Sequence, residues 1–211
     1  YGDHRDLHSF PTRRSSDPAT YVWDFEQPLP GGTSCTLATR EGLKSAKGYA
    51  VDAASFTVDA GGPVARAVLP TYGDIEEDQT FLVAANMPAT PQSVAANAYC
   101  AVDGIGEKIA VDVLPADLPT KLLGAMRDRY DVQNFLERAG LPRDLPVDVA
   151  QRRQAVASVT ALKCRRPLPP GRDVALIWGA GISGAGGKKA GADQRFDYTV
   201  RKPFSARFEC S

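Results

Sequence analysis

Residues 167–178 read PLPPGRDVALIW, and residues 28–39 read PLPGGTSCTLAT. Each stretch begins with a turn rich in proline and glycine and continues into a run typical of a β-strand. The two turns lie 139 positions apart, so the chain carries two copies of one turn–strand unit. Self-similarity of this kind indicates repeated structural modules.

The repeat extends well past the turn. After the strand, each copy passes through a loop rich in glycine and lysine, then reaches an aromatic-flanked Thr-Val pair, and then a proline followed by Ala-Arg. Because these landmarks keep the same order and nearly the same offset, they predict two tandem β modules. The matched segments are EGLKSAKG at 41–48 and SGAGGKKAG at 183–191, FTV at 56–58 and YTV at 198–200, and Ala-Arg at 65–66 and 206–207.

The rest of the chain favours the same fold class. Its 211 residues include 19 glycines and 16 prolines, which favours many turns between short strands. No alternation of strands and helices is visible, so we predict an all-β fold of tandem Ig-like β-sandwich modules. Asp103-Gly104 indicates a hairpin turn between two of the strands. The predicted strands are 20–25, 33–39, 55–59, 63–69, 80–85, 98–102, 108–114, 158–164, 174–178, 196–200 and 204–210.

One segment departs from the β pattern. Between residues 117 and 157, apolar residues recur at spacings of three and four, which predicts two or three short helices. Prolines at 119, 142 and 146 punctuate them. We therefore expect a short helical insertion in the second module.

These features divide the chain into four parts. Residues 18–60 are predicted to be the C-terminal half of a truncated Ig-like module, 61–201 a complete β-sandwich, and 202–211 the first strand of a truncated following module. Almost no linker separates them, which favours a stiff rod. Residues 1–17, YGDHRDLHSFPTRRSSD, resemble the translation of a common short-read sequencing adapter, so we expect a disordered artefact there.

Composition excludes several classes of function. Lys plus Arg equals Asp plus Glu at 25 each, which gives no electrostatic reason to expect a nucleic-acid partner. No run approaches about 18 apolar residues, so no direct membrane insertion is expected. The two histidines, His4 and His8, both precede residue 18. Residues 18–211 therefore supply neither a Ser-His-Asp triad nor an imidazole zinc site, and we expect no enzyme activity, no metal and no cofactor.

A formal phosphate-binding motif, G-x-G-x-x-G, is formed by Gly179, Gly181 and Gly184 after a predicted strand. A dinucleotide site also needs a helix behind the motif and an acidic residue about 20 positions further on. The following residues are instead rich in glycine and lysine, and position 199 is a threonine. We interpret the segment as a loop and Lys188-Lys189 as its solvated tip.

Charged clusters and tryptophans have equally plain interpretations. The acidic cluster at 74–78 could bind calcium, but no D-x-D-x-D-G loop is present. We therefore interpret the cluster as a solvated loop. A basic group is interpreted as surface charge. Trp23 and Trp178 are expected to pack in cores rather than to bind a ligand. The acidic cluster is Asp74, Glu76, Glu77 and Asp78, and the basic group is Arg152, Arg153, Lys163, Arg165 and Arg166.

The four cysteines, Cys35, Cys100, Cys164 and Cys210, show no C-x-x-C spacing and all fall in predicted strands. Three pairings are formally possible, and four buried free thiols are the alternative. We favour a Cys100–Cys164 disulfide because both residues lie in the complete module and flank the helical insertion. Closing that loop would stabilise the fold by about 4 kcal/mol. Cys35 and Cys210 lie in truncated modules, so we expect their partners outside this sequence.

Four long blocks resemble the N-terminal region of bacterial α2-macroglobulins. They are WDFEQPLPGGTSC at 23–35, AYCAVDGIGEKI at 98–109, the RRPLPPG…VALIWGAGI run at 165–182 and PFSARFEC at 203–210. The helical insertion matches no part of that family that we can place. The family's disulfides suggest that Cys35 pairs upstream and Cys210 downstream.

The resemblance implies a scaffold segment of a large periplasmic protease inhibitor, often a lipoprotein on the inner membrane. Its partners would be other domains of the same parent chain and, through the full-length protein, target proteases. Family members trap proteases with a bait region and a Cys-x-Glu-Gln thioester, and neither is identifiable here. No catalytic or binding residue is therefore carried over. The alternative is an Ig-like surface adhesin or carbohydrate-binding scaffold.

Overall fold

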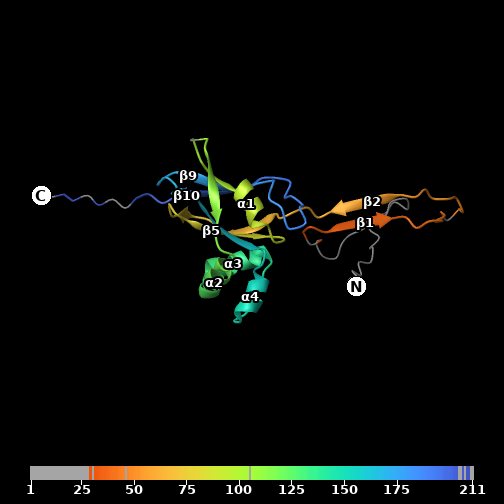
Figure 1. The fold of residues 1–211 in the computed structure, drawn as a ribbon, viewed down its shortest axis with the longest axis horizontal. Coiled ribbons are helices and arrows are strands. Elements are labelled where there is room, and N and C mark those ends of the chain that lie inside the picture. Colours follow the sequence, from red (N-terminus) through yellow and green to blue (C-terminus); the bar gives the residue numbers. More distant parts are fainter. Residues whose placement is uncertain are drawn as a thin grey trace.

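The computed structural model describes residue 29 and residues 31–45, 47–104, 106–203, 206 and 208–209. Residues 1–17, Trp23, the strand expected at 20–25 and Cys210 lie outside the described residues. The described chain forms a long two-stranded hairpin that projects from a β-sandwich with three of its four helices on one side (Figure 1). Residues 201–203 leave the sandwich on the side away from the hairpin (Figure 1).

The projecting hairpin consists of β1 (Ser34–Ala38) and β2 (Ser55–Asp59). The two strands pair antiparallel, with Ser34 opposite Asp59 at the end nearest the sandwich. Among the described residues, neither strand has a second neighbour. The hairpin therefore exposes two unpaired edges, a condition that folded sheets normally avoid.

The sandwich contains eight strands: β3 (Ala65–Leu69), β4 (Asp74–Ile75), β5 (Thr80–Ala85), β6 (Tyr99–Val102), β7 (Lys108–Val113), β8 (Val159–Cys164), β9 (Asp173–Trp178) and β10 (Gln194–Val200). They are hydrogen-bonded in the order β3-β5-β8-β7-β6-β9-β10-β4. β7 belongs to both sheets, because Ala110 pairs with Tyr99 of β6 whereas Val111 pairs with Cys164 of β8. One sheet is thus β3-β5-β8 with the end of β7, and the other is the start of β7 with β6-β9-β10-β4.

The core between the two sheets is apolar and cross-linked. The rings of Phe81 and Tyr198 face each other with centroids 5.3 Å apart. Trp178 is fully buried, and its indole N–H donates to the Pro63 carbonyl oxygen at 2.9 Å. A disulfide joins Cys100 of β6 to Cys164 of β8, with Cα atoms 6.0 Å apart. The disulfide therefore ties one sheet to the other across the core.

Two helices, α2 (Leu118–Ala125) and α3 (Tyr130–Ala139), cover the outer face of the β3-β5-β8 sheet, and α4 (Val149–Ala155), which has no buried residue, packs against α2. Along β5, Phe81 and Val83 face the sandwich core, while Leu82 and Ala84 belong to a second core with Phe135 of α3. Burial on both faces explains the unbroken apolar run at 80–85. The structure confirms an all-β fold with a helical insertion.

Two elements were not expected from the sequence, and most of the strand expected at 204–210 lies outside the described residues. α1 (Pro91–Asn97) begins after Thr90, whose hydroxyl caps it by accepting from the Ser93 N–H. Asp74 and Ile75 form β4, which pairs parallel with β10, so the expectation of a solvated loop is wrong at Asp74. Of the strand expected at 204–210, the described residues 206 and 208–209 are not in a strand.

The two copies of the repeat share one backbone pattern. Antiparallel bridges link Lys44 to Ala50 and, 139 positions later, Ser183 to Lys189. Five backbone hydrogen bonds recur at the same offset in donor and acceptor alike. Donor and acceptor residues are Gly32→Gly61 and Gly171→Val200, Leu43→Arg40 and Ile182→Gly179, Ser45→Tyr49 and Gly184→Lys188, Gly48→Ser45 and Gly187→Gly184, and Val51→Leu43 and Ala190→Ile182.

The β1–β2 hairpin is therefore the structural counterpart of the β9–β10 hairpin. In the sandwich, β9 also pairs with β6 and β10 with β4. The projecting hairpin is an antiparallel pair of the same kind without the flanking strands. Its register differs by one residue, because Ser34 pairs with Asp59 whereas Asp173 pairs with Thr199, 140 positions after Asp59. The module boundaries given above stay predictions.

Candidate functional site

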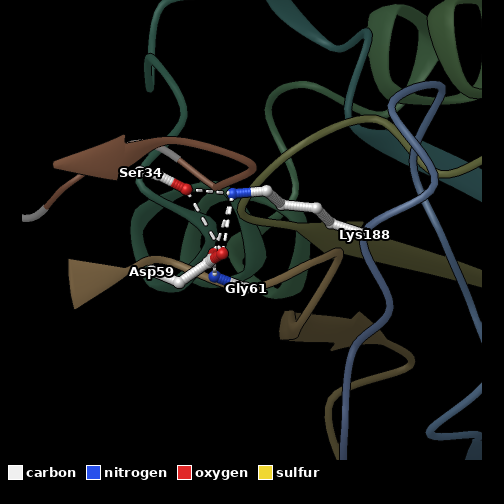
Figure 2. A network of polar contacts seen from close by, with 4 residues as sticks. All are labelled: Ser34, Asp59, Gly61 and Lys188. Atoms are coloured by element: carbon white, nitrogen blue, oxygen red, sulfur yellow. Dashed lines mark hydrogen bonds and ion pairs between the residues drawn. The ribbon is translucent and has the colours of Figure 1, made fainter. Parts of the chain in front are cut away.

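The hairpin and the sandwich meet in a region that we call the junction, formed by Ser34, Asp59, Gly62, Met87 and Lys188. Figure 2 shows Lys188, from the loop at 183–191, reaching the base of the hairpin. Its Nζ lies 2.6 Å from Ser34 Oγ and 2.9 Å from each carboxylate oxygen of Asp59. Asp59 also accepts from the Ser34 hydroxyl at 3.3 Å and from the Gly61 N–H at 2.8 Å.

These contacts set the electrostatics of the junction. The hydrogen bond from Lys188, and next the one from the Gly61 N–H, lower the pKa of Asp59 below its ordinary value of 3.8. The ion pair is only partly shielded, with the Lys188 side chain 30% exposed and that of Asp59 53% exposed. Pairs this exposed contribute little to stability, so the ion pair alone does not hold the hairpin in place.

Close backbone approach at glycines completes the junction. The Gly62 N–H donates to the Lys189 carbonyl at 3.0 Å, and a Cβ at Gly62 would overlap the backbone of Lys189. The Met87 side chain lies against both Gly32 of the hairpin and Gly184 of the sandwich loop. A side chain at Gly62 would therefore meet backbone and hold the two parts further apart, whereas one at Gly32 or Gly184 would meet the flexible end of Met87.

Lys188 was expected at a solvated loop tip, and this expectation is wrong. The loop is folded back by its own bridge between Ser183 and Lys189, which presents Lys188 to Asp59. Ser34, Asp59 and Met87 were not singled out from the sequence, because no local motif marks them. The consecutive glycines at 61 and 62 were the available signal, since they stand where one module joins the next.

The G-x-G-x-x-G motif is a packing site. A Cβ at Gly179 would overlap the carbonyl oxygen of Asn97, and one at Gly181 would overlap its side-chain amide. The motif continues into the bridged loop at 183–191 rather than into a helix. It therefore lacks the helix N-terminus that binds a pyrophosphate.

The acidic cluster is not assembled into a metal site. Asp74 lies in β4, and Glu76 forms an ion pair with Arg201 at 2.7 Å. Across the part of the chain that the structure describes, no three Asp, Glu, His or Cys side chains are grouped so as to hold a metal ion.

The basic group is dispersed into separate contacts. Arg165 pairs with Asp112 at 3.0 Å, and Arg166 pairs with Glu107 at 2.7 Å. Arg152 instead donates to the Pro146 carbonyl at 3.0 Å. Three of the five charges are thus used in local contacts.

The cysteines divide into two groups. Cys100 and Cys164, the pair favoured from the sequence, form the disulfide across the sandwich. Cys35 is partly buried in β1 and forms no disulfide with a described residue. Its pairing outside this sequence stays a prediction, as does that of Cys210.

No protein-family model matches the chain, and no curated protein matches it. In the described part, no helix is long and apolar enough to cross a membrane. Three similar solved structures are crystal structures of the S-layer protein rSbsC(31-844) and of the N-terminal part of the bacterial S-layer protein SbsC, and a cryo-EM reconstruction of native E. coli α2-macroglobulin.

These structural likenesses are distant. Identities are 13%, 14% and 12%, and TM-scores are 0.37, 0.37 and 0.35, in the same order. The matches cover 70%, 69% and 67% of this chain but 15%, 25% and 6% of those chains. TM-scores this low assign neither a family nor a function to the chain.

Proposed function

We propose that this chain is a non-catalytic scaffold segment of a bacterial α2-macroglobulin-like protease inhibitor. Its contribution is to set the distance and orientation between consecutive β modules of a larger periplasmic protein. Protease trapping, with its bait region and thioester, is assigned to other parts of the parent chain. The lipoprotein anchor expected of the parent is part of the same proposal.

The observation that supports a scaffold is the junction itself. A hairpin that is the counterpart of β9–β10 is held against the next sandwich by an ion pair at Lys188 and by backbone contact at Gly62. Such contacts couple neighbouring modules directly, whereas a flexible linker would leave them free to reorient. The macroglobulin family is supported by the four sequence blocks.

Sequencing the genomic locus on both sides of codons 18–211 tests the family. We expect natural coding sequence in place of residues 1–17 and, far downstream in the same frame, a Cys-x-Glu-Gln motif. A frame that continues only as Ig-like repeats with a surface anchor would replace the inhibitor with the adhesin or carbohydrate-binding scaffold.

A Gly62→Ala variant of the full chain tests the scaffold role. Residual dipolar couplings of hairpin and sandwich amides should fit one alignment tensor in the native chain. They should need two in the variant, because the new Cβ meets the Lys189 backbone. Gly186→Ala is the matched control, since a Cβ there has open space. Two tensors in the native chain would overturn the stiff-scaffold proposal.

A further inference from the structure

The bases of the two equivalent hairpins carry the same cross-strand pair of side chains. In the projecting hairpin, Ser34 lies opposite Asp59 and its hydroxyl donates to the carboxylate at 3.3 Å. In the sandwich, Asp173 of β9 lies opposite Thr199 of β10, whose hydroxyl donates to the carboxylate at 2.7 Å. The carboxylate has changed strands, but a register pair places both side chains on one face.

The first of these pairs is occupied. Lys188, on a loop rich in glycine, places its ammonium on both members of the Ser34–Asp59 pair. The molecule therefore holds its own example of what a carboxylate–hydroxyl pair at this position binds. At the equivalent place in the sandwich, no described lysine or arginine reaches Asp173.

The surroundings of the second pair favour a cation more strongly than those of the first. Thr199 also lies opposite Asp74 of β4, so a carboxylate stands on each side of it. A surface depression of about 410 Å³ opens here, lined in part by Asp103 and Asp197. Those two aspartates share Arg195, at 3.2 and 2.7 Å. Asp74 and Asp173 are left without an ion pair among the described residues.

We propose that the Asp74–Thr199–Asp173 row binds a lysine carried on a glycine-rich loop of a neighbouring β module. This end of the sandwich lies away from the hairpin (Figure 1), where a following module would stand. The inference deepens the proposed scaffold function, because it names the contact that would form the next junction.

The two junctions would differ in one respect. Continued from the strand register, in which Thr199 takes the place of Asp59, Gly61 and Gly62 correspond to Arg201 and Lys202, one position beyond the offset of 139. Side chains at those positions prevent the backbone approach that Gly62 allows. Both junctions would therefore have a lysine bound to a carboxylate and a hydroxyl, but only the first would also have the backbone contact.

A loop peptide provides the test. The probe is a head-to-tail cyclic peptide of residues 182–191, ISGAGGKKAG, because cyclisation preserves the folded loop and lowers the ordering cost of binding. It is titrated to 10 mM into the ¹⁵N-labelled full chain. We expect saturable shifts of the Asp74, Asp173 and Thr199 amides with a millimolar Kd, as for an exposed ion pair.

Variants make the result specific. Asp173→Asn should weaken binding at least threefold, and Thr199→Val should also weaken it, while Asp144→Asn, an exposed aspartate in the helical insertion, should leave it unchanged. A peptide with alanine in place of Lys188 should not bind. The proposal is overturned if that peptide binds equally, if no signal shifts, or if Asp173→Asn has no effect.

Calcium at 1 mM is titrated in parallel. If it shifts these amides while the peptide does not, the row is a metal site and the proposal is wrong. The failure of peptide binding and the binding of calcium would both leave the alignment tensor of the hairpin and sandwich unchanged. The residual dipolar couplings therefore test the scaffold function independently of this proposal.

Discussion

Asp59 is the residue whose ionisation reports on the junction. Its pKa lies below 3.8 because Lys188 and the Gly61 N–H stabilise the carboxylate. A pKa depressed in the folded state means that the ion pair stabilises the junction above about pH 3.8, and that this stabilisation is lost as pH falls through the lower folded value. Lys188→Ala should therefore raise the pKa of Asp59 toward 3.8.

A ¹³C NMR titration of the Asp59 carboxyl carbon measures this shift. Lys189→Ala is the matched control, because the neighbouring lysine is exposed and forms no ion pair with a described residue. An equal rise in both variants, or no rise in Lys188→Ala, would show that Lys188 does not hold the carboxylate.

The contacts of individual residues could be predicted only where a repeat or an apolar strand in the sequence placed them. Cys100 and Cys164 could be paired because the repeat places both in one complete module. Trp178 could be placed in a core because it ends an apolar strand, and it is fully buried. The partners of Lys188 could not be found, because Ser34 and Asp59 lie 154 and 129 positions away and no local pattern points to them.

At the scale of elements, α3 is the main anchor of the helical layer. Phe135 is fully buried in the core between the helices and the β3-β5-β8 sheet. Phe135→Ala should lower the free energy of unfolding by about 3–5 kcal/mol, since a buried phenylalanine leaves a large cavity. Tyr130→Ala at the start of the same helix should cost within about 0.5 kcal/mol, because Tyr130 is 78% exposed.

Urea unfolding of both variants, followed by far-ultraviolet circular dichroism with the disulfide intact, measures the difference. Similar losses in the two variants would mean that α3 does not depend on its buried face.

The elements that were predicted correctly share one property. The strands at 55–59 and 80–85 match β2 and β5 to the residue, because turns bound each run sharply. α1 and β4 were missed for opposite reasons. Seven residues of α1 show no amphipathic stripe, and its start depends on the Thr90 cap. Two residues of β4 become a strand only through pairing with β10, which lies far away in the sequence.

For the whole molecule, the projecting hairpin is the part that opposes solubility. Leu43, Tyr49, Val51 and Phe56 are all exposed on it, and both of its strand edges lack partners among the described residues. Unpaired edges with apolar side chains favour self-association. A chain limited to residues 61–201 should therefore stay monomeric at higher concentration than residues 18–211.

Gel filtration of both chains over a range of concentrations tests this expectation. Phe56→Thr in the longer chain, which removes an exposed aromatic ring while keeping β propensity, should recover part of the difference. Aggregation of the shorter chain alone would contradict the predicted boundaries.

The position of the disulfide has a mechanical consequence. All three helices of the insertion lie between Cys100 and Cys164, which are 64 positions apart. When the chain is pulled from its two ends, tension passes through the sulfur–sulfur bond and bypasses that whole segment. Reduction should then add on the order of 200 Å to the contour length released on unfolding in a single-molecule experiment. With the bond closed, the helical layer carries no load, and a strained parent protein would lengthen far less than its sequence allows.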